Sequence, residues 1–135
     1  MGCKYCHFHE KGILDDADMD VFKILDNVKA YAKGNFKIGF VGNGAGLLDW
    51  PKLKSYITYL ENYPNISIYT ITNGTVPLSD EDWRFLENHH VNVGFSIDGY
   101  KELHDKNRSN SFDKAMHNVS EYKRVTGHYP TFNAT

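Results

Sequence analysis

Two cysteines three positions apart are the most reactive side chains of this sequence, and their spacing is typical of a metal or redox site. Cys3 and Cys6 enclose the segment CKYC, and the 135 residues contain no other cysteine. We expect a cytoplasmic protein, and there paired thiols more often bind a metal or exchange electrons than form a structural disulfide. Thiolates are ligands of iron–sulfur clusters and of zinc. The pattern therefore predicts metal or redox chemistry at these two residues.

Two kinds of small site could use the same cysteines. His7 and His9 follow Cys6 closely, so CKYCHFH offers two thiolates and two imidazoles to a zinc ion. Structural zinc sites usually separate their ligand pairs by a dozen or more residues, which this segment does not do. A thioredoxin-like dithiol should follow a strand and open a helix, and no strand is expected before Cys3. A small CxxC metal or redox protein stays an alternative.

Three short polar segments rich in glycine follow three apolar runs. They are Gly42-Asn43-Gly44 after FKIGFV, Thr72-Asn73-Gly74 at the end of ISIYTIT, and Ser96 to Gly99 at the end of VNVGFSI. Asn-Gly and Asp-Gly are common turn dipeptides, so each segment alone could be only a turn. In parallel α/β folds, however, ligands bind beyond the carboxyl ends of the strands. Three such segments in succession predict a pocket that includes Asn73, Ser96 and Asp98.

Composition and charge exclude some classes of partner. Hydrophobic residues make up 41% of the chain and charged residues 24%, which is ordinary for a globular domain. The net charge of −2 gives no basic excess for nucleic acid, and no apolar run is long enough to span a membrane. We therefore expect one domain over residues 1–135 that binds neither nucleic acid nor a membrane.

The elements that must position these residues alternate between helix and strand. Helices are predicted at 20–32, from Pro51, after Ser79 and after Ser111, and strands are predicted at 36–41, 66–72, 91–97 and 130–135. Gly34 is expected to end the first helix. Ser79, with Asp82 three residues later, is typical of a capping box, and Ser111 is expected to cap the last helix.

The order of these elements predicts the fold class. A helix between successive strands requires parallel pairing, and strands buried on both faces should be nearly continuous apolar runs, as these are. The class is α/β, with about four parallel strands and flanking helices. Four strands do not close a barrel of eight. The sheet is therefore either small and open or a partial (β/α) barrel.

These motifs together give a resemblance. The chain resembles the N-terminal part of radical S-adenosylmethionine (radical SAM) enzymes, most closely the anaerobic sulfatase maturases and peptide-modifying enzymes with SPASM-type domains. That family shows C-x3-C-x2-C, then a GGEP-like motif, TNGT, and SIDG…HD…R…SF. Here the matching segments are CKYC (3–6), FVGNGAGLL (40–48), TNGT (72–75) and SIDGYKELHDKNRSNSF (96–112). The resemblance runs over nearly the whole chain and implies a partial barrel of the radical SAM type.

The resemblance implies two cofactors. A [4Fe–4S] cluster would be held by Cys3 and Cys6, with Tyr5 close to it. S-adenosylmethionine (SAM) would be bound by the following residues: Tyr5, Gly42, Asn43, Gly44, Asn73, Ser96, Asp98 and Arg108. Ser96 and Arg108 match the family positions for the SAM carboxylate, and the backbone of Gly42 to Gly44 would approach the amino group. In this family one electron cleaves SAM to a 5′-deoxyadenosyl radical, which takes a hydrogen atom from the substrate.

The resemblance also implies partners. A peptide or protein would be the substrate, and flavodoxin or ferredoxin would be the electron donor. Whether the fragment is itself an enzyme is left open, and it is expected to be inactive alone. The alternative, from a different class, is a non-catalytic α/β fragment without a cluster.

The sequence departs from the family pattern in two places. The family's first cysteine should stand four residues before Cys3, outside the 135 residues, and the chain is expected to hold a cluster poorly without it. Ala45-Gly46 stands where the family usually has Glu-Pro, and alanine cannot neutralise the ammonium group of SAM as glutamate can.

Two of the candidate residues also have plain structural explanations. Asp98 could only shape a turn with Gly99, and Arg108 could be a solvated surface arginine. Between Ser96 and Arg108 lies the pair His104-Asp105. A His-Asp pair is typical of general-base chemistry. At this place we expect it instead to order the loop that carries Arg108.

Overall fold

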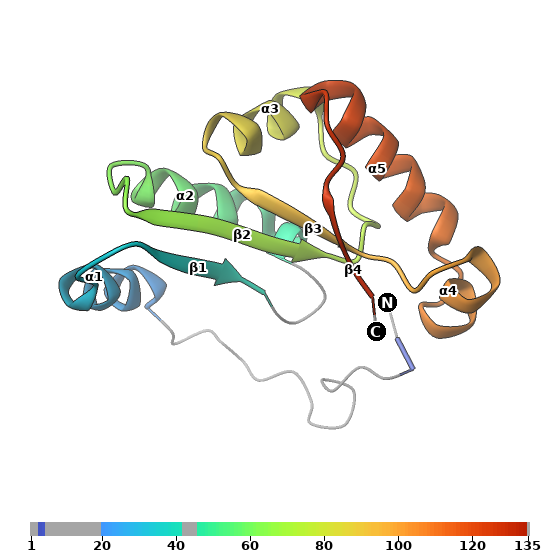
Figure 1. The fold of residues 1–135 in the computed structure, drawn as a ribbon, viewed down its shortest axis with the longest axis horizontal. Coiled ribbons are helices and arrows are strands. Elements are labelled where there is room, and N and C mark those ends of the chain that lie inside the picture. Colours follow the sequence, from blue (N-terminus) through green and yellow to red (C-terminus); the bar gives the residue numbers. More distant parts are fainter. Residues whose placement is uncertain (1–2, 5–19, 42–45, 135) are drawn as a thin grey trace.

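The fold is one parallel sheet with helices packed against it (Figure 1). The computed structural model describes residues 3–4, 20–41 and 46–134. The strands are β1 (Phe36–Phe40), β2 (Ile66–Thr72), β3 (Asn92–Ser96) and β4 (Thr131–Asn133). They pair in the order β1-β2-β3-β4, and each pair is parallel. The predicted α/β class with four parallel strands is confirmed.

Five α-helices connect and cover the strands. They are α1 (Val21–Tyr31), α2 (Trp50–Leu60), α3 (Asp80–Asn88), α4 (Lys101–Asn107) and α5 (Phe112–Thr126), and the short 3-10 helix η2 (Gly46–Asp49) leads into α2. Figure 1 shows α2, α3 and α5 on the same side of the sheet, while α1 lies beside the start of β1. None of the described helices is long and apolar enough to cross a bilayer.

The core lies between this sheet face and the helices α1, α2, α3 and α5, and the buried Leu25 of α1 belongs to it. Phe95 of β3 packs against Trp83 of α3 and Tyr122 of α5, with ring centroids 6.3 Å and 6.4 Å apart. Phe40 of β1 stacks on Tyr56 of α2. A fully buried large apolar side chain stabilises a fold by about 1.5–3 kcal/mol. This shared core therefore fixes where the strand ends stand relative to α4 and α5.

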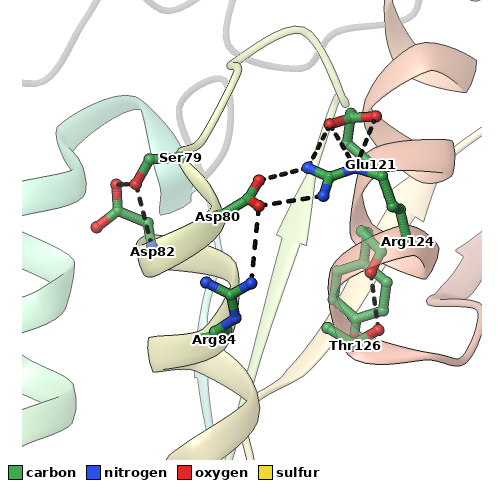
Figure 2. A network of polar contacts seen from close by, with 8 residues as sticks. Ser79, Asp80, Asp82, Arg84, Glu121, Arg124 and Thr126 are labelled. Atoms are coloured by element: carbon green, nitrogen blue, oxygen red, sulfur yellow. Dashed lines mark hydrogen bonds and ion pairs between the residues drawn. The ribbon is translucent and has the colours of Figure 1, made fainter.

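A network of ion pairs joins α3 to α5 at the surface (Figure 2). Arg124 of α5 donates to both carboxylate oxygens of Asp80, and it also binds Glu121 one turn earlier. Arg84 approaches the same Asp80 carboxylate at 3.7 Å. Exposed pairs of this kind each contribute about 0–1 kcal/mol, so the network supports the helix pair but does not hold it alone.

The helix boundaries confirm one predicted cap and correct two. Ser79 caps α3 as expected, since its Oγ accepts the Asp82 N–H at 3.1 Å. Gly34 does not end α1: the helix ends at Tyr31, and the N–H of the next residue, Ala32, donates to Val28 O. The prediction for Gly34 was wrong because an extended residue, not a left-handed one, follows the helix.

Ser111 stands at the N-cap position of α5, but its hydroxyl does not cap the helix. The Asp105 carboxylate accepts the Phe112 N–H instead, at 2.9 Å. Asp105 belongs to α4, a helix that the sequence pattern did not predict. The Ser111 hydroxyl is directed to other partners, and these lie at the candidate site.

Candidate functional site

The carboxyl ends of β2 and β3 bring two of the predicted polar residues to one edge of the sheet. Thr72, the last residue of β2, pairs with Phe95, next to the end of β3. Asn73 directly follows β2, Asp98 lies two residues after the end of β3, and both are buried. Asn73 Oδ1 accepts hydrogen bonds from the Thr75 N–H at 2.9 Å and from its hydroxyl at 2.7 Å. Asn73 therefore shapes the TNGT turn as well as lying at the predicted edge.

A buried asparagine of α5, which the sequence analysis missed, holds this turn in place. Asn118 Nδ2 donates to Gly74 O at 2.7 Å and to Val76 O at 3.2 Å. Its position was readable: it shares the buried face of α5 with Ala115, Val119 and Tyr122. A polar residue on such a face usually has a specific partner. Here the partner is the backbone that follows β2.

Asp98 and Arg108 form a buried ion pair. Arg108 Nη2 lies 2.9 Å from Asp98 Oδ1, and the two side chains are only 8% and 0% exposed. Asn107 Nδ2 approaches the other carboxylate oxygen at 3.5 Å. Arg108 is therefore not a solvated surface residue, and Asp98 does more than shape the turn at Gly99. Burial strengthens the attraction of such a pair and makes the removal of either partner costly.

The same arginine reaches the cysteine segment. Arg108 Nη1 lies 4.0 Å from Cys3 Sγ, and the Lys4 N–H donates to Asn107 O at 3.0 Å. Cys3 is a free, half-buried thiol. Two contacts thus attach residues 3–4 to the C-terminal end of α4, more than a hundred positions later in the sequence. Cys3 comes to the same edge of the sheet as Asp98, as the predicted site requires.

His104 connects the backbone of Asp98 to Ser111, which in turn binds the backbone of Arg108. The ring is fully buried, Nδ1 accepts the Asp98 N–H at 3.3 Å, and Nε2 lies 3.0 Å from Ser111 Oγ. Ser111 Oγ donates in turn to Arg108 O at 2.8 Å. Burial lowers the pKa of His104 below its ordinary value, and the positive charge of Arg108 adds to this effect. The ring is therefore neutral near pH 7.

The structure brings together one part of the predicted site and does not describe another. Cys3, Asn73, Asp98 and Arg108 gather at the carboxyl edge of the sheet, where Ser96, half-buried, ends β3. The other predicted residues lie outside the described residues: Tyr5, Cys6, Gly42, Asn43 and Gly44. The thiol can bind a metal. The hydroxyl, the amide and the guanidinium, which is held by a carboxylate, can bind a charged ligand beside it.

A family model described as "Radical SAM superfamily" matches residues 1–133. The cysteine-type anaerobic sulfatase-maturating enzyme of Clostridium novyi (strain NT) is 30% identical over 146 aligned positions, covering 94% of this chain and 38% of that enzyme. The enzyme of the same name from Clostridium perfringens (strain ATCC 13124) is 35% identical over 121 positions, covering 78% of this chain and 31% of the relative. The chain thus spans about a third of the length of these relatives.

Solved structures agree with the sequence matches. Native anSMEcpe with bound AdoMet superposes with a TM-score of 0.70 at 25% identity, covering 98% of this chain and 39% of that one. The complex with AdoMet and the Cp18Cys peptide gives a TM-score of 0.71 at 26% identity, with 99% and 38% covered. Nearly all of the chain follows this fold, so the predicted partial (β/α) barrel is confirmed.

Proposed function

Because the chain belongs to the radical SAM superfamily, we propose that it forms part of an enzyme that binds an iron–sulfur cluster and SAM in order to modify a peptide or protein. The observation that carries the proposal is the meeting of Cys3 with the Asp98–Arg108 ion pair at the carboxyl ends of the strands. A thiol for iron and a guanidinium for a ligand carboxylate lie there in direct contact. Residues 1–135 would be part of the core domain of that enzyme.

Two of the three cysteines that the family uses for an iron–sulfur cluster are present in this sequence. Cys3 and Cys6 would be two of the thiolate ligands of a [4Fe–4S] cluster, and Tyr5 would lie beside it. A guanidinium next to a ligating sulfur stabilises negative charge there and orients the ligand, as outer-shell groups generally do. When bound, the cluster supplies the electron that cleaves SAM. The contribution of this chain is to hold Cys3 through Arg108, and the neighbouring Lys4 through Asn107 O.

The residues at the strand ends fit SAM. Arg108 and the Ser96 hydroxyl would bind its carboxylate, and the backbone at Gly42, Asn43 and Gly44 would receive its amino group. Asp98 keeps the guanidinium in one orientation, at 2.9 Å, and a guanidinium has five N–H donors for more than one acceptor. Asn73 would line the same pocket from the end of β2.

The substrate class rests on the relatives. Two of them are named sulfatase-maturating enzymes, and a peptide is bound in one of the similar structures. We therefore propose a peptide or protein as the substrate and a flavodoxin or ferredoxin as the electron donor. A non-catalytic α/β fragment is the competing explanation, and the experiment below separates the two.

The test is iron and sulfide content after anaerobic reconstitution, compared between a chain lengthened to carry a cysteine four residues before Cys3 and the Cys3→Ser and Cys6→Ser variants of that lengthened chain. We expect each substitution to lower bound iron, because each removes a thiolate ligand. His117→Asn is the control, since this exposed histidine of α5 lies outside the proposed site. Iron content that is near zero, or that neither cysteine affects, would favour the non-catalytic fragment.

A further inference from the structure

We propose that His104 and Ser111 are positioning residues: a buried chain of hydrogen bonds through them links the backbone of Asp98 to the carbonyl of Arg108 and so fixes the direction of the Arg108 guanidinium. The two ends of the chain are the two partners of the buried ion pair. The part of this inference that concerns SAM rests on the proposed function. The part that concerns the ion pair stands without it.

The first link determines where the proton of the imidazole lies. Nδ1 of His104 accepts the Asp98 N–H, so Nδ1 carries no proton. A neutral ring then has its proton on Nε2. Because the ring is fully buried, its charged form is unfavourable, and this agrees with the neutral tautomer.

The second and third links follow from the first. The Nε2–H can only donate, so Ser111 Oγ accepts it at 3.0 Å. The hydroxyl proton of Ser111 then points to Arg108 O, 2.8 Å away. Each link has one direction of donation, and both ring nitrogens are engaged. His104 is therefore not placed to act as a general base, and its role is to hold its neighbours.

The backbone after Arg108 explains why such a link is needed. Ser109 and Asn110 adopt positive φ angles of 55° and 54°, although neither is a glycine. A left-handed conformation costs an L-residue about 1–2 kcal/mol, so two in succession need support from outside. The bond from Ser111 to Arg108 O closes this turn, and the Asn110 N–H donates to Asp105 O at 3.2 Å. Loss of the Ser111 bond should let the turn relax and the guanidinium rotate away from Asp98.

Three variants test whether these hydrogen bonds position Arg108 or whether the loss of any buried hydrogen bond has the same effect. Ser111→Ala removes the bond to Arg108. His104→Asn keeps an acceptor near the Asp98 N–H but loses the bond to Ser111. Thr70→Val is the matched control, because the fully buried Thr70 hydroxyl also donates to a backbone carbonyl, that of Phe40 at 2.9 Å, in the middle of β2.

The readout is solvent exchange of the Arg108 Nε–H by NMR, with the signal assigned from its loss in Arg108→Lys. We expect exchange to be about fivefold faster in Ser111→Ala and in His104→Asn. This is the change in an equilibrium constant that corresponds to the loss of one net hydrogen bond. Thr70→Val should leave the rate unchanged. The proposal is overturned if exchange is unchanged in both test variants, or if Thr70→Val raises it equally.

A measurement on the unaltered chain covers the case in which a variant does not fold. The ¹⁵N shifts of the His104 ring report its tautomer, and we expect Nδ1 to be the unprotonated nitrogen. A protonated Nδ1 contradicts the first link and ends the proposal.

Titration with AdoMet separates this inference from the proposed function. Where the parent binds AdoMet, Ser111→Ala should weaken binding by about fivefold, and the effect should vanish in an Arg108→Ala background. An equal loss in both backgrounds would mean that Ser111 does not act through Arg108. If the parent does not bind AdoMet, the proposed function fails, while the exchange and tautomer measurements still decide whether His104 and Ser111 position the ion pair.

Discussion

At the scale of single residues, Arg108 has the greatest number of roles. It holds Asp98, touches Cys3 and is proposed to bind the carboxylate of SAM. A guanidinium suits such sharing, because its donors diverge in one rigid plane, whereas a lysine ammonium is a single point charge. Substitutions at this residue therefore test the proposed pocket most directly.

We expect Arg108→Ala to weaken AdoMet binding by roughly tenfold or more, since a charge-assisted hydrogen bond contributes about 1.5–3 kcal/mol. Arg108→Lys should restore only part of the affinity, and Ser96→Ala, which removes a neutral hydroxyl, should cost less. Isothermal titration calorimetry measures each constant. Arg84→Ala, at an exposed position of α3, is the control. Equal affinities for the parent and Arg108→Ala would remove Arg108 from the SAM site.

The same substitution should also destabilise the fold. Arg108→Ala leaves the Asp98 carboxylate buried without its counter-charge, which typically costs about 3–5 kcal/mol. The double variant Arg108→Ala with Asp98→Asn should recover part of that loss, because the buried charge is gone. Urea denaturation of the three chains gives the free energies of unfolding. A loss of the same size in the double variant would argue against the ion pair.

The protonation of His104 should make stability depend on pH. Its pKa is lowered in the folded chain by burial and by Arg108, while the charges of Asp98 and Asp105 act in the opposite direction. The folded state therefore favours the neutral ring. The stability that the neutral ring contributes is fully present above the ordinary pKa of 6.5. It is lost as the pH falls through the lower pKa that His104 has in the folded chain.

The measurement is the free energy of unfolding between pH 7 and pH 5. We expect it to fall with pH more steeply in the parent than in His104→Asn, which cannot titrate there. His117→Asn should behave like the parent. Identical slopes in the parent and His104→Asn would mean that His104 is not held neutral by burial.

At the scale of elements, the contact between the TNGT turn and α5 decides where the end of β2 stands. Gly74 has a φ of +77°, and a Cβ built there would lie 2.8 Å from Ala115 Cβ and 3.0 Å from its backbone Cα. A glycine is thus required both by its conformation and by the close approach of the helix. Asn118 then secures the same turn by two hydrogen bonds.

Gly74→Ala should therefore destabilise the chain by more than the conformational cost alone. Gly127→Ala is a matched control: its φ of +86° is equally left-handed, but nothing lies within 4 Å of its added Cβ. The control should cost about 1–2 kcal/mol, and Gly74→Ala should cost clearly more because α5 must shift. Thermal unfolding of both variants gives the comparison. Equal losses would show that the turn does not press against α5.

At the scale of the whole molecule, the described part is an arc with two sheet edges. β1 and β4 each pair on one side only within residues 20–41 and 46–134. Phe132 of β4 is 51% exposed, although its neighbour in the register, Phe95, is fully buried under α3 and α5. Open strand edges and exposed aromatic side chains promote association between chains.

We expect the chain to self-associate, and Phe132→Ser to reduce this association without loss of stability. Tyr31→Ser is the control, because Tyr31 is 84% exposed on α1, away from this edge. Sedimentation velocity at several concentrations measures the effect. If the chain stays monomeric at all concentrations and unfolds in one sharp transition, the prediction that the open strand edge promotes self-association is contradicted.

Local patterns in the sequence determined the elements and the class of fold. ISIYTIT predicted β2 at its observed bounds, and Ser79 with Asp82 predicted the start of α3. These features depend on side-chain spacing within a few residues, which the sequence displays directly. The motifs also identified the carboxyl edge, since parallel strands bring their ends to one side.

Only the tertiary structure decided how the site residues are paired. The Asp98–Arg108 ion pair, the contact of Arg108 with Cys3 and the hold of Asn118 on Gly74 join residues 10, 105 and 44 positions apart. Even the hydroxyl of Ser111, expected to cap α5, is directed to Arg108, because the Asp105 carboxylate supplies that cap. Helical and strand periodicity say which face a side chain is on. Which partner it finds depends on how the elements pack, because a polar group that loses water must bind whatever the fold has brought within reach.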